Sequence, residues 1–267
     1  MPLNLRLMLA VLLALGLAAP AAAGTIKITA TAQATLENGR LSVNLSLVNQ
    51  GDEAAQNLSL KLISAGQQIE VPGPAVLAPN QPNQTTLAMP VEPKLPGTYP
   101  AVVQVRFHDL NGYPFTSLAN ALYFHQRPTF AQVSGRGLPS QVAGEGEVSY
   151  EITALDQSPL KVAVRLFAPQ ELSLGRDRLE LELAGRSRQT VSAPIKNFTA
   201  LVGASYPVLA LLEYDQDGLH HSAVAVAVVS LAPPPSFITR LTPYLYLAAG
   251  LLVALLAWLQ WRRRKPA

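Results

Sequence analysis

The amino-acid sequence predicts an all-β protein in which two tandem β-sandwich domains precede one transmembrane α-helix. Three observations lead to this prediction. Apolar side chains recur at every second position through the interior of the chain, which is the period of a half-buried strand. The interior also repeats itself at an offset of 107 residues, the separation of Tyr99 and Tyr206. Finally, an apolar segment stands near each end of the chain.

The N-terminal apolar segment has the three parts of a secretory signal peptide. Arg6 precedes an apolar run from Leu7 to Ala19, and Ala21-Ala22-Ala23 offers small residues for cleavage before Gly24. A first transmembrane helix is the alternative, but the run is short for one. We therefore interpret residues 1–23 as a signal peptide that is removed on export.

The alternation of apolar and polar residues marks strands in both halves of the interior. It runs through Leu41–Leu47, Leu58–Leu62 and Val103–Phe107, and again through Val148–Ile152, Val162–Leu166 and Leu179–Leu183. Short strands with one buried and one wet face, separated by frequent turns, are typical of a two-sheet antiparallel sandwich. We expect one sandwich in residues 24–126 and a second in residues 127–232.

Three dipeptides predict tight turns between these strands. They are Asn38-Gly39, Asn111-Gly112 and Asp217-Gly218. Gly, Asn and Asp tolerate the positive φ that a two-residue hairpin turn requires. Each dipeptide is therefore interpreted as a two-residue hairpin.

Tyr99 and Tyr206 occupy equivalent positions in the repeat. Each follows a turn of small residues, precedes a proline and opens the longest apolar strand of its half. A tyrosine corner stands at this place in a sandwich, with its hydroxyl bonded back to the backbone. We interpret both residues as tyrosine corners, with an ordinary buried tyrosine as the alternative.

The run PGTYPAVVQVRFHDLNG, preceded by NLSLVNQGDEAAQNLSLKL, resembles known modules of bacterial and archaeal surface proteins. These are immunoglobulin-like and fibronectin type III-like, adhesion-related modules, in which a strand ending in Asn-x-Gly precedes one beginning Ala-x-Asn. Asn49-Gln50-Gly51 and Ala55-Gln56-Asn57 match that pattern, whereas Asp156-Gln157-Ser158 departs from it in the second half. The resemblance covers about residues 25–231. It implies two tandem immunoglobulin-like β-sandwiches but no single function, because such modules serve as spacers, adhesins and assembly platforms.

The C-terminal segment predicts a membrane anchor. Residues 233–240 form a proline-rich stalk, and residues 241–261 carry no charge. At about 1.5 Å per residue, the uncharged segment spans roughly 31 Å as a helix, the thickness of a bilayer core. The basic tail at 262–267 marks the cytoplasmic side. We therefore expect contact with the lipid bilayer through residues 241–261 and two domains on the outer side.

The composition argues against several classes of function. Residues 24–240 hold 15 Lys and Arg against 17 Asp and Glu, so the exported part presents no basic excess for nucleic acid. The chain contains no cysteine, which favours a bacterial envelope over an animal secretory pathway. We expect the bacterial inner membrane as its location, with periplasmic domains and a cytoplasmic C-terminus.

No catalytic, metal or cofactor motif stands out in the sequence. The Gly-x-Ser-x-Gly, His-Glu-x-x-His and phosphate-loop patterns are all absent. His220 and His221 are adjacent, and neighbouring residues of a strand point to opposite faces, so they do not predict a shared metal. Asp215-Gln216-Asp217-Gly218 is better interpreted as a hairpin than as a calcium loop. The expectation is a non-enzymatic protein with no cofactor.

One predicted sheet face of the second domain is apolar where the first domain is polar. The outward positions of the strand are Gln104, Arg106 and His108 in the first half, and Leu209, Leu211 and Glu213, the only charged residue, in the second. The next strand alternates Ala and Val, and we place Val224, Val226 and Val228 in the core. The outward face would then comprise Leu209, Leu211, Ala223, Ala225 and Ala227. Such a patch favours a partner surface, with coverage by the first domain, a loop or the bilayer as the alternative.

These observations predict a single-pass envelope protein that presents two domains near the membrane. Its expected role is that of an accessory or scaffold for a membrane or envelope protein complex. The alternative is an adhesive module that binds glycan or cell-wall polymer. An aromatic platform for that alternative would comprise Tyr113, Phe115 and Tyr123.

Overall fold

The computed structural model describes residues 25–233 and, beyond them, residues 241, 244, 246, 247 and 251. The predicted signal peptide, the basic tail, and nearly all of the predicted stalk and transmembrane helix lie outside the described residues. Over the part of the chain that is described, no helix combines the length and the apolar character needed to cross a membrane.

The first sandwich is built from eight strands in two facing sheets. One sheet has the order β1-β2-β6, and the other has the order β8-β7-β3-β4 with β5 also paired to β3. The strands are β1 (Ile28–Glu37), β2 (Arg40–Asn49), β3 (Ala55–Ser64), β4 (Gln67–Pro72), β5 (Val76–Leu77), β6 (Pro82–Pro90), β7 (Gly97–His108) and β8 (Pro114–His125).

The second sandwich repeats this arrangement with nine strands. One sheet has the order β13-β15-β11-β9, and the other has the order β14-β12-β16-β17, with β10 parallel to the end of β17. A single parallel pair, His220 of β17 with Gly97 of β7, joins the latter sheet to β8-β7-β3-β4 of the first sandwich. The strands are β9 (Val133–Gly137), β10 (Ser140–Val142), β11 (Glu145–Ala154), β12 (Leu160–Phe167), β13 (Leu172–Leu174), β14 (Arg178–Leu183), β15 (Arg188–Asn197), β16 (Ser205–Gln216) and β17 (Leu219–Leu231).

The predicted all-β sandwich class and the predicted alternation are confirmed. In β2, Leu41, Val43, Leu45 and Leu47 are all buried in the first core. Their equivalents in β11, 107 residues later, are buried in the second core: Val148, Tyr150, Ile152 and Ala154. Strands β3, β6, β7 and β8 likewise correspond to β12, β15, β16 and β17. Each half of the chain therefore closes its own apolar core.

The turn predictions hold at two of three sites. Asn38-Gly39 has φ angles of 50° and 74°, and Asp217-Gly218 has φ angles of 52° and 72°, so both are two-residue turns with positive φ at each position. Asn111-Gly112 instead belongs to a longer loop between His108 and Pro114. There the amide of Gly112 donates to the carbonyl of Asp109 at 3.1 Å, which closes a turn, and the carboxylate of Asp109 accepts hydrogen bonds from the amides of Asn111 and Tyr113.

Both repeat-related tyrosines bond back to the backbone just upstream. The hydroxyl of Tyr99 donates to the carbonyl of Leu95 at 2.8 Å, and the amide of Leu201 donates to the hydroxyl of Tyr206 at 2.9 Å. Both rings are buried at the start of their strands. These are the contacts by which a corner tyrosine ties the preceding turn to the strand.

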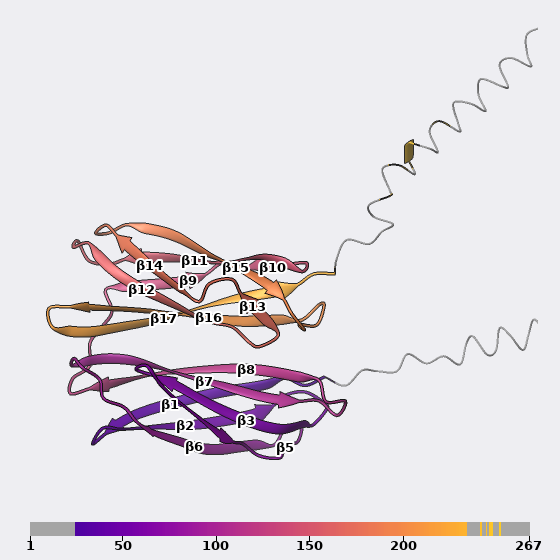
Figure 1. Ribbon diagram of the computed structural model, residues 1–267, viewed down its shortest axis with the longest axis horizontal. Coiled ribbons are helices and arrows are strands. Elements are labelled where there is room, and N and C mark those ends of the chain that lie inside the picture. The colour runs from indigo at the N-terminus through magenta and orange to yellow at the C-terminus, as the bar shows by residue number, and fades with distance from the viewer. Residues whose placement is uncertain (1–24, 234–240, 242–243, 245, 248–250, 252–267) are drawn as a thin grey trace, which may run out of the picture.

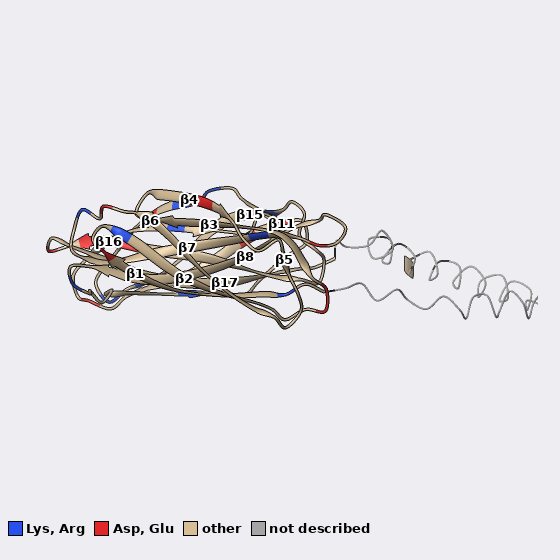
Figure 2. Ribbon diagram, turned by 90° about the horizontal axis from the view of Figure 1, so that it is seen from below, with Lys and Arg blue, Asp and Glu red and all other residues tan. Residues whose placement is uncertain are grey.

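The two sandwiches lie side by side rather than end to end (Figure 1). The sheet that contains β16 and β17 faces the sheet that contains β7 and β8. Figure 2 shows that the strands of both sandwiches run along the long axis of one body, with acidic and basic residues interspersed. The chain enters the first sandwich and leaves the second at the same end of this body (Figure 1).

Removing the hydroxyl of a corner tyrosine should destabilise the sandwich that contains it. Tyr99→Phe and Tyr206→Phe should each lower the free energy of unfolding by about 1 kcal/mol, because a buried backbone group loses its partner. Denaturant unfolding gives the size of the change, and amide hydrogen exchange assigns it to one core. Tyr113→Phe, at an exposed tyrosine, is the control. Identical unfolding of the wild type and both variants would contradict this role.

Candidate functional site at the junction of the sandwiches

The outer sheet faces of the two sandwiches bury each other. Val102 of β7 and Leu118 of β8 form one apolar cluster with Leu209 and Leu211 of β16. Phe167 and Val224 pack against the edge of this cluster. Since Leu209 and Leu211 are only 2% and 1% exposed, the apolar outer face of β16 is occupied within the chain.

The strand phase expected for residues 223–229 is wrong. Ala225 and Ala227 are buried in the second core, and Ala223 packs against that core, whereas Val226 and Val228 are exposed. The cause is the Asp217-Gly218 turn. It pairs Gln216 with Leu219 and hence Leu209 with Val226, and direct cross-strand partners share a face. Leu209 and Leu211 do point out of the second core, as expected, but the first sandwich covers them.

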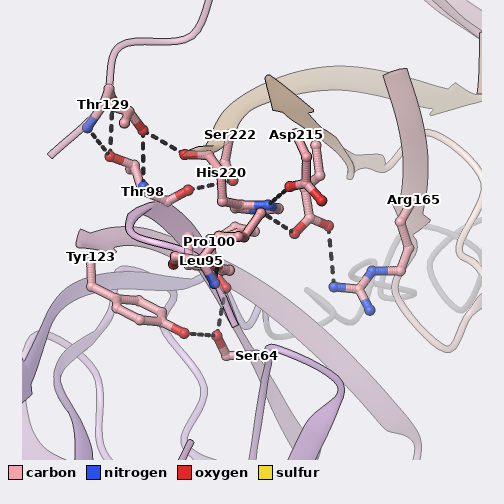
Figure 3. Close-up of polar contacts among 12 residues, drawn as sticks. Ser64, Leu95, Thr98, Pro100, Tyr123, Thr129, Arg165, Asp215, His220 and Ser222 are labelled. Carbon is pink, nitrogen blue, oxygen red and sulfur yellow. Dashed lines mark hydrogen bonds and ion pairs between the residues drawn. The ribbon is translucent and has the colours of Figure 1, made fainter. Parts of the chain in front are cut away.

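Polar groups close one end of the junction (Figure 3). The hydroxyl of Thr129, in the linker between the sandwiches, donates to the carbonyl of His220 at 2.6 Å. Thr98 of β7 and Thr129 bond to each other, and the hydroxyl of Ser222 donates to the carbonyl of Thr98 at 2.8 Å. At Gly97, a Cβ would overlap the carbonyl oxygen of His220, so the close approach of β7 and β17 requires glycine.

His220 lies at the centre of this end of the junction. Its ring stacks on that of Tyr99, with the two centroids 4.0 Å apart and an interplanar angle of 11°. Nδ1 lies 2.7 Å from the carboxylate of Asp215, and Nε2 lies 3.5 Å from the carboxylate of Glu213. Glu213 also pairs with Arg165 at 3.5 Å. His220 of the second sandwich, with a carboxylate near each ring nitrogen, thus stacks on Tyr99 of the first.

Two opposing effects act on the pKa of His220. Burial disfavours the charged ring and lowers the pKa, but hydrogen bonds and charge from Glu213 and Asp215 outweigh burial. The net result is a pKa above the ordinary value of 6.5 for histidine. The protonated ring therefore stabilises the folded β16–β17 hairpin, on which His220 and both carboxylates stand.

A cleft of about 650 Å³ opens beside His220, between the two sandwiches. Its walls include the β3–β4 turn and Lys94 from the first sandwich, and Arg165 and Arg178 from the second. Acidic side chains from both sandwiches balance these cations. Among the residues that the structure describes, no three or more His, Cys, Asp or Glu side chains are placed to hold a metal ion.

A buried carboxylate closes the other end of the junction. Glu171 follows β12, is 1% exposed, and accepts a hydrogen bond from the amide of Thr116 on β8 at 2.8 Å. Burial raises the pKa of Glu171, and the hydrogen bond from Thr116 opposes that rise only in part. A single glutamate beside a predicted strand gave no signal of this role in the sequence.

The three aromatic residues of the predicted glycan platform do not share one surface. Tyr123 is buried in the first core, and its hydroxyl bonds to that of Ser64 at 2.9 Å. Phe115 is half-buried and stacks on Phe107, with ring centroids 5.7 Å apart. Tyr113 alone is exposed.

Comparison with known proteins adds no family assignment. No protein-family model matches the sequence, and no curated protein matches it either. Among solved structures, α-2-macroglobulin of Escherichia coli is 14% identical, with 79% of this chain and 17% of that chain covered and a TM-score of 0.31. The putative ApaA protein of Bordetella pertussis is 15% identical over 39% of this chain and 96% of that chain, with a TM-score of 0.30. CBD12 from CALX1.2 is 8% identical over 76% of this chain and 99% of that chain, with a TM-score of 0.26.

These likenesses carry no argument about function, because every TM-score is low. This chain also spans only about a sixth of the length of the α-2-macroglobulin chain that it matches. The junction between the sandwiches therefore has to be interpreted from its own residues.

A charge placed in the apolar junction should separate the sandwiches without unfolding their cores. Leu209→Glu would bury a carboxylate against the first sandwich, which should cost about 3 kcal/mol or more. Nitroxide labels, one in each sandwich, should then report a broad distance distribution in place of a narrow one. Val226→Glu is the matched control, because Val226 pairs with Leu209 across the hairpin but is 46% exposed. Equal distributions in both variants would contradict the assigned junction.

The stability of the folded protein should fall as the pH rises. The pKa of His220 is raised, so its contribution is complete below the ordinary pKa of histidine and is lost as the pH passes the raised value. The raised pKa of Glu171 acts in the same direction at lower pH, because burial penalises its charged form. Unfolding of the wild type from pH 5 to pH 9 should show this loss, and His220→Gln should remove its upper part. A His220→Gln variant with the pH profile of the wild type would exclude His220 as the cause.

Proposed function

We propose that this protein is a non-enzymatic envelope protein whose two immunoglobulin-like sandwiches act as one rigid scaffold close to a membrane. The observation that carries the proposal is the buried contact of Leu209 and Leu211 with Val102 and Leu118. A flexible tandem would leave these side chains in water. A fixed pair of domains instead presents its surfaces at one constant spacing.

The polar contacts of the junction support rigidity as well. Hydrogen bonds from Thr129 and Ser222 join the linker, β7 and β17 at one end, and Glu171 bonds to Thr116 at the other. Because the junction is hydrogen-bonded at both ends and packed with apolar side chains in the centre, the sandwiches have little freedom to rotate against each other. An accessory protein that holds a partner in a fixed position needs such a body.

The non-enzymatic part of the proposal rests on how the polar side chains of the junction are used. His220 lies between two carboxylates and stacks on Tyr99, so its ring is engaged in holding the sandwiches together. Its Nε2 is buried without a hydrogen-bond partner and faces the carboxylate of Glu213 at 3.5 Å. The glycan-binding alternative lacks a continuous aromatic platform, because Tyr123 lies in the core.

The location and the partner belong to the proposal too. The sequence supports a signal peptide at residues 1–23 and a transmembrane helix at 241–261, with a basic tail at 262–267. These segments would place the sandwiches on the periplasmic side of a bacterial inner membrane. A membrane or envelope protein beside the anchor would then be the partner.

Reporter fusions in a bacterial host test the proposed topology. Alkaline phosphatase fused after Ala232 should be active, because the enzyme matures only outside the cytoplasm. The same reporter fused after Ala267 should be inactive, and a cytoplasmic reporter at Ala267 should show the converse. The opposite pair of activities would overturn the proposed orientation.

A further inference from the structure

We infer that two loops at one end of the body form a lipid-contact surface that lies on the outer face of the membrane. The loops are residues 109–113, between β7 and β8, and residues 198–204, between β15 and β16; together they are called the end loops. The inference rests on the proposed membrane anchor and goes beyond it, because an anchor alone does not orient the body.

The tips of the end loops are apolar and open to solvent. Large apolar side chains in folded proteins are seldom left so exposed in a group. The five residues and their exposed fractions are Leu110 at 69%, Tyr113 at 58%, Phe198 at 76%, Leu201 at 50% and Val202 at 55%.

Both end loops lie where the chain enters and leaves the body. They border a single cavity of about 660 Å³, which is also lined by Thr25 at the start of the described chain. The amide of Gly203 donates to the carbonyl of Leu231, the last residue of β17, at 2.7 Å. The eight residues 233–240 reach about 25 Å in an extended polyproline conformation. The predicted anchor therefore keeps this end of the body next to the bilayer.

The carboxylates near the end loops are engaged in shaping them. Glu53 accepts a hydrogen bond from the amide of Leu110 at 3.0 Å, and Asp109 accepts bonds from Asn111 and Tyr113. Asp52 accepts a bond from the amide of Thr25. These bonds hold the apolar tips outward. The acidic groups also predict a preference for zwitterionic over anionic lipid, since like charges repel.

Apolar and aromatic tips of this kind partition into the boundary between headgroups and acyl chains. The opposite end also exposes Phe124, Phe130 and Leu155, so the proposed anchor decides which end meets the membrane. A rigid body tethered at the end loops would stand upright on the bilayer. Its cleft beside His220 lies toward the opposite end, where the Asp217-Gly218 turn joins β16 to β17. The cleft beside His220 would then face away from the bilayer.

The absence of cysteine allows a direct test on the full chain. Leu110→Cys and Val202→Cys each receive a polarity-sensitive fluorophore, and the proteins are reconstituted into phosphatidylcholine vesicles. Phe130→Cys is the matched control: Phe130 is 85% exposed but lies at the opposite end, where its carbonyl bonds to His221. Emission at 110 and 202 should shift to the blue and be quenched by nitroxide lipids, and emission at 130 should do neither.

Each outcome decides the inference. Water-like emission at both loops overturns it, whether or not the protein remains in the vesicles after alkaline carbonate. A blue shift without quenching by lipid overturns it as well, and indicates contact with a second copy of the chain. Lipid quenching in a protein that carbonate extracts would support the loop contact and remove the anchor from the proposed function.

Discussion

The buried contact between the outer faces of two sheets is the constraint on which the rest of this structure depends. An antiparallel sandwich normally keeps the outer face of each sheet in water. Here β16 carries Leu209 and Leu211 on that face, so the second sandwich needs the first to cover it. The side-by-side arrangement, the stacking of His220 on Tyr99 and the cleft beside them all follow from this one contact.

Much of the fold could be predicted from the sequence, because the signals for it are local. Alternation in Leu41–Leu47 places the apolar side chains in one core whatever the rest of the chain does. Asn38-Gly39 sets a turn through its own φ preferences. At Asn111-Gly112 the dipeptide is one part of a longer loop, in which the backbone and the carboxylate of Asp109 also accept hydrogen bonds.

The site was less predictable, because it depends on register and on contacts distant in sequence. The Asp217-Gly218 dipeptide predicts the turn, but the register that this turn imposes places Ala225 in the second core and not on the predicted outer face. The polar-to-apolar change from Gln104 to Leu211 did signal a buried surface. Nothing local indicated that the first sandwich would cover it, or that Glu171 would bond to Thr116, 55 residues upstream.

The residues of the junction also have a symmetry. Val102 and Leu209 are equivalent in the repeat, and Leu118 and Val224 pair with the equivalent positions Gln104 and Leu211. The two copies thus meet through the same patch, which is how an isologous homodimer is built. Here both halves of the contact belong to one polypeptide. The effective concentration of one sandwich at the other is therefore set by the linker and not by the amount of protein. Identical subunits must carry the same patch, whereas two halves of one chain need not: here the first half has Gln104 where the second has Leu211.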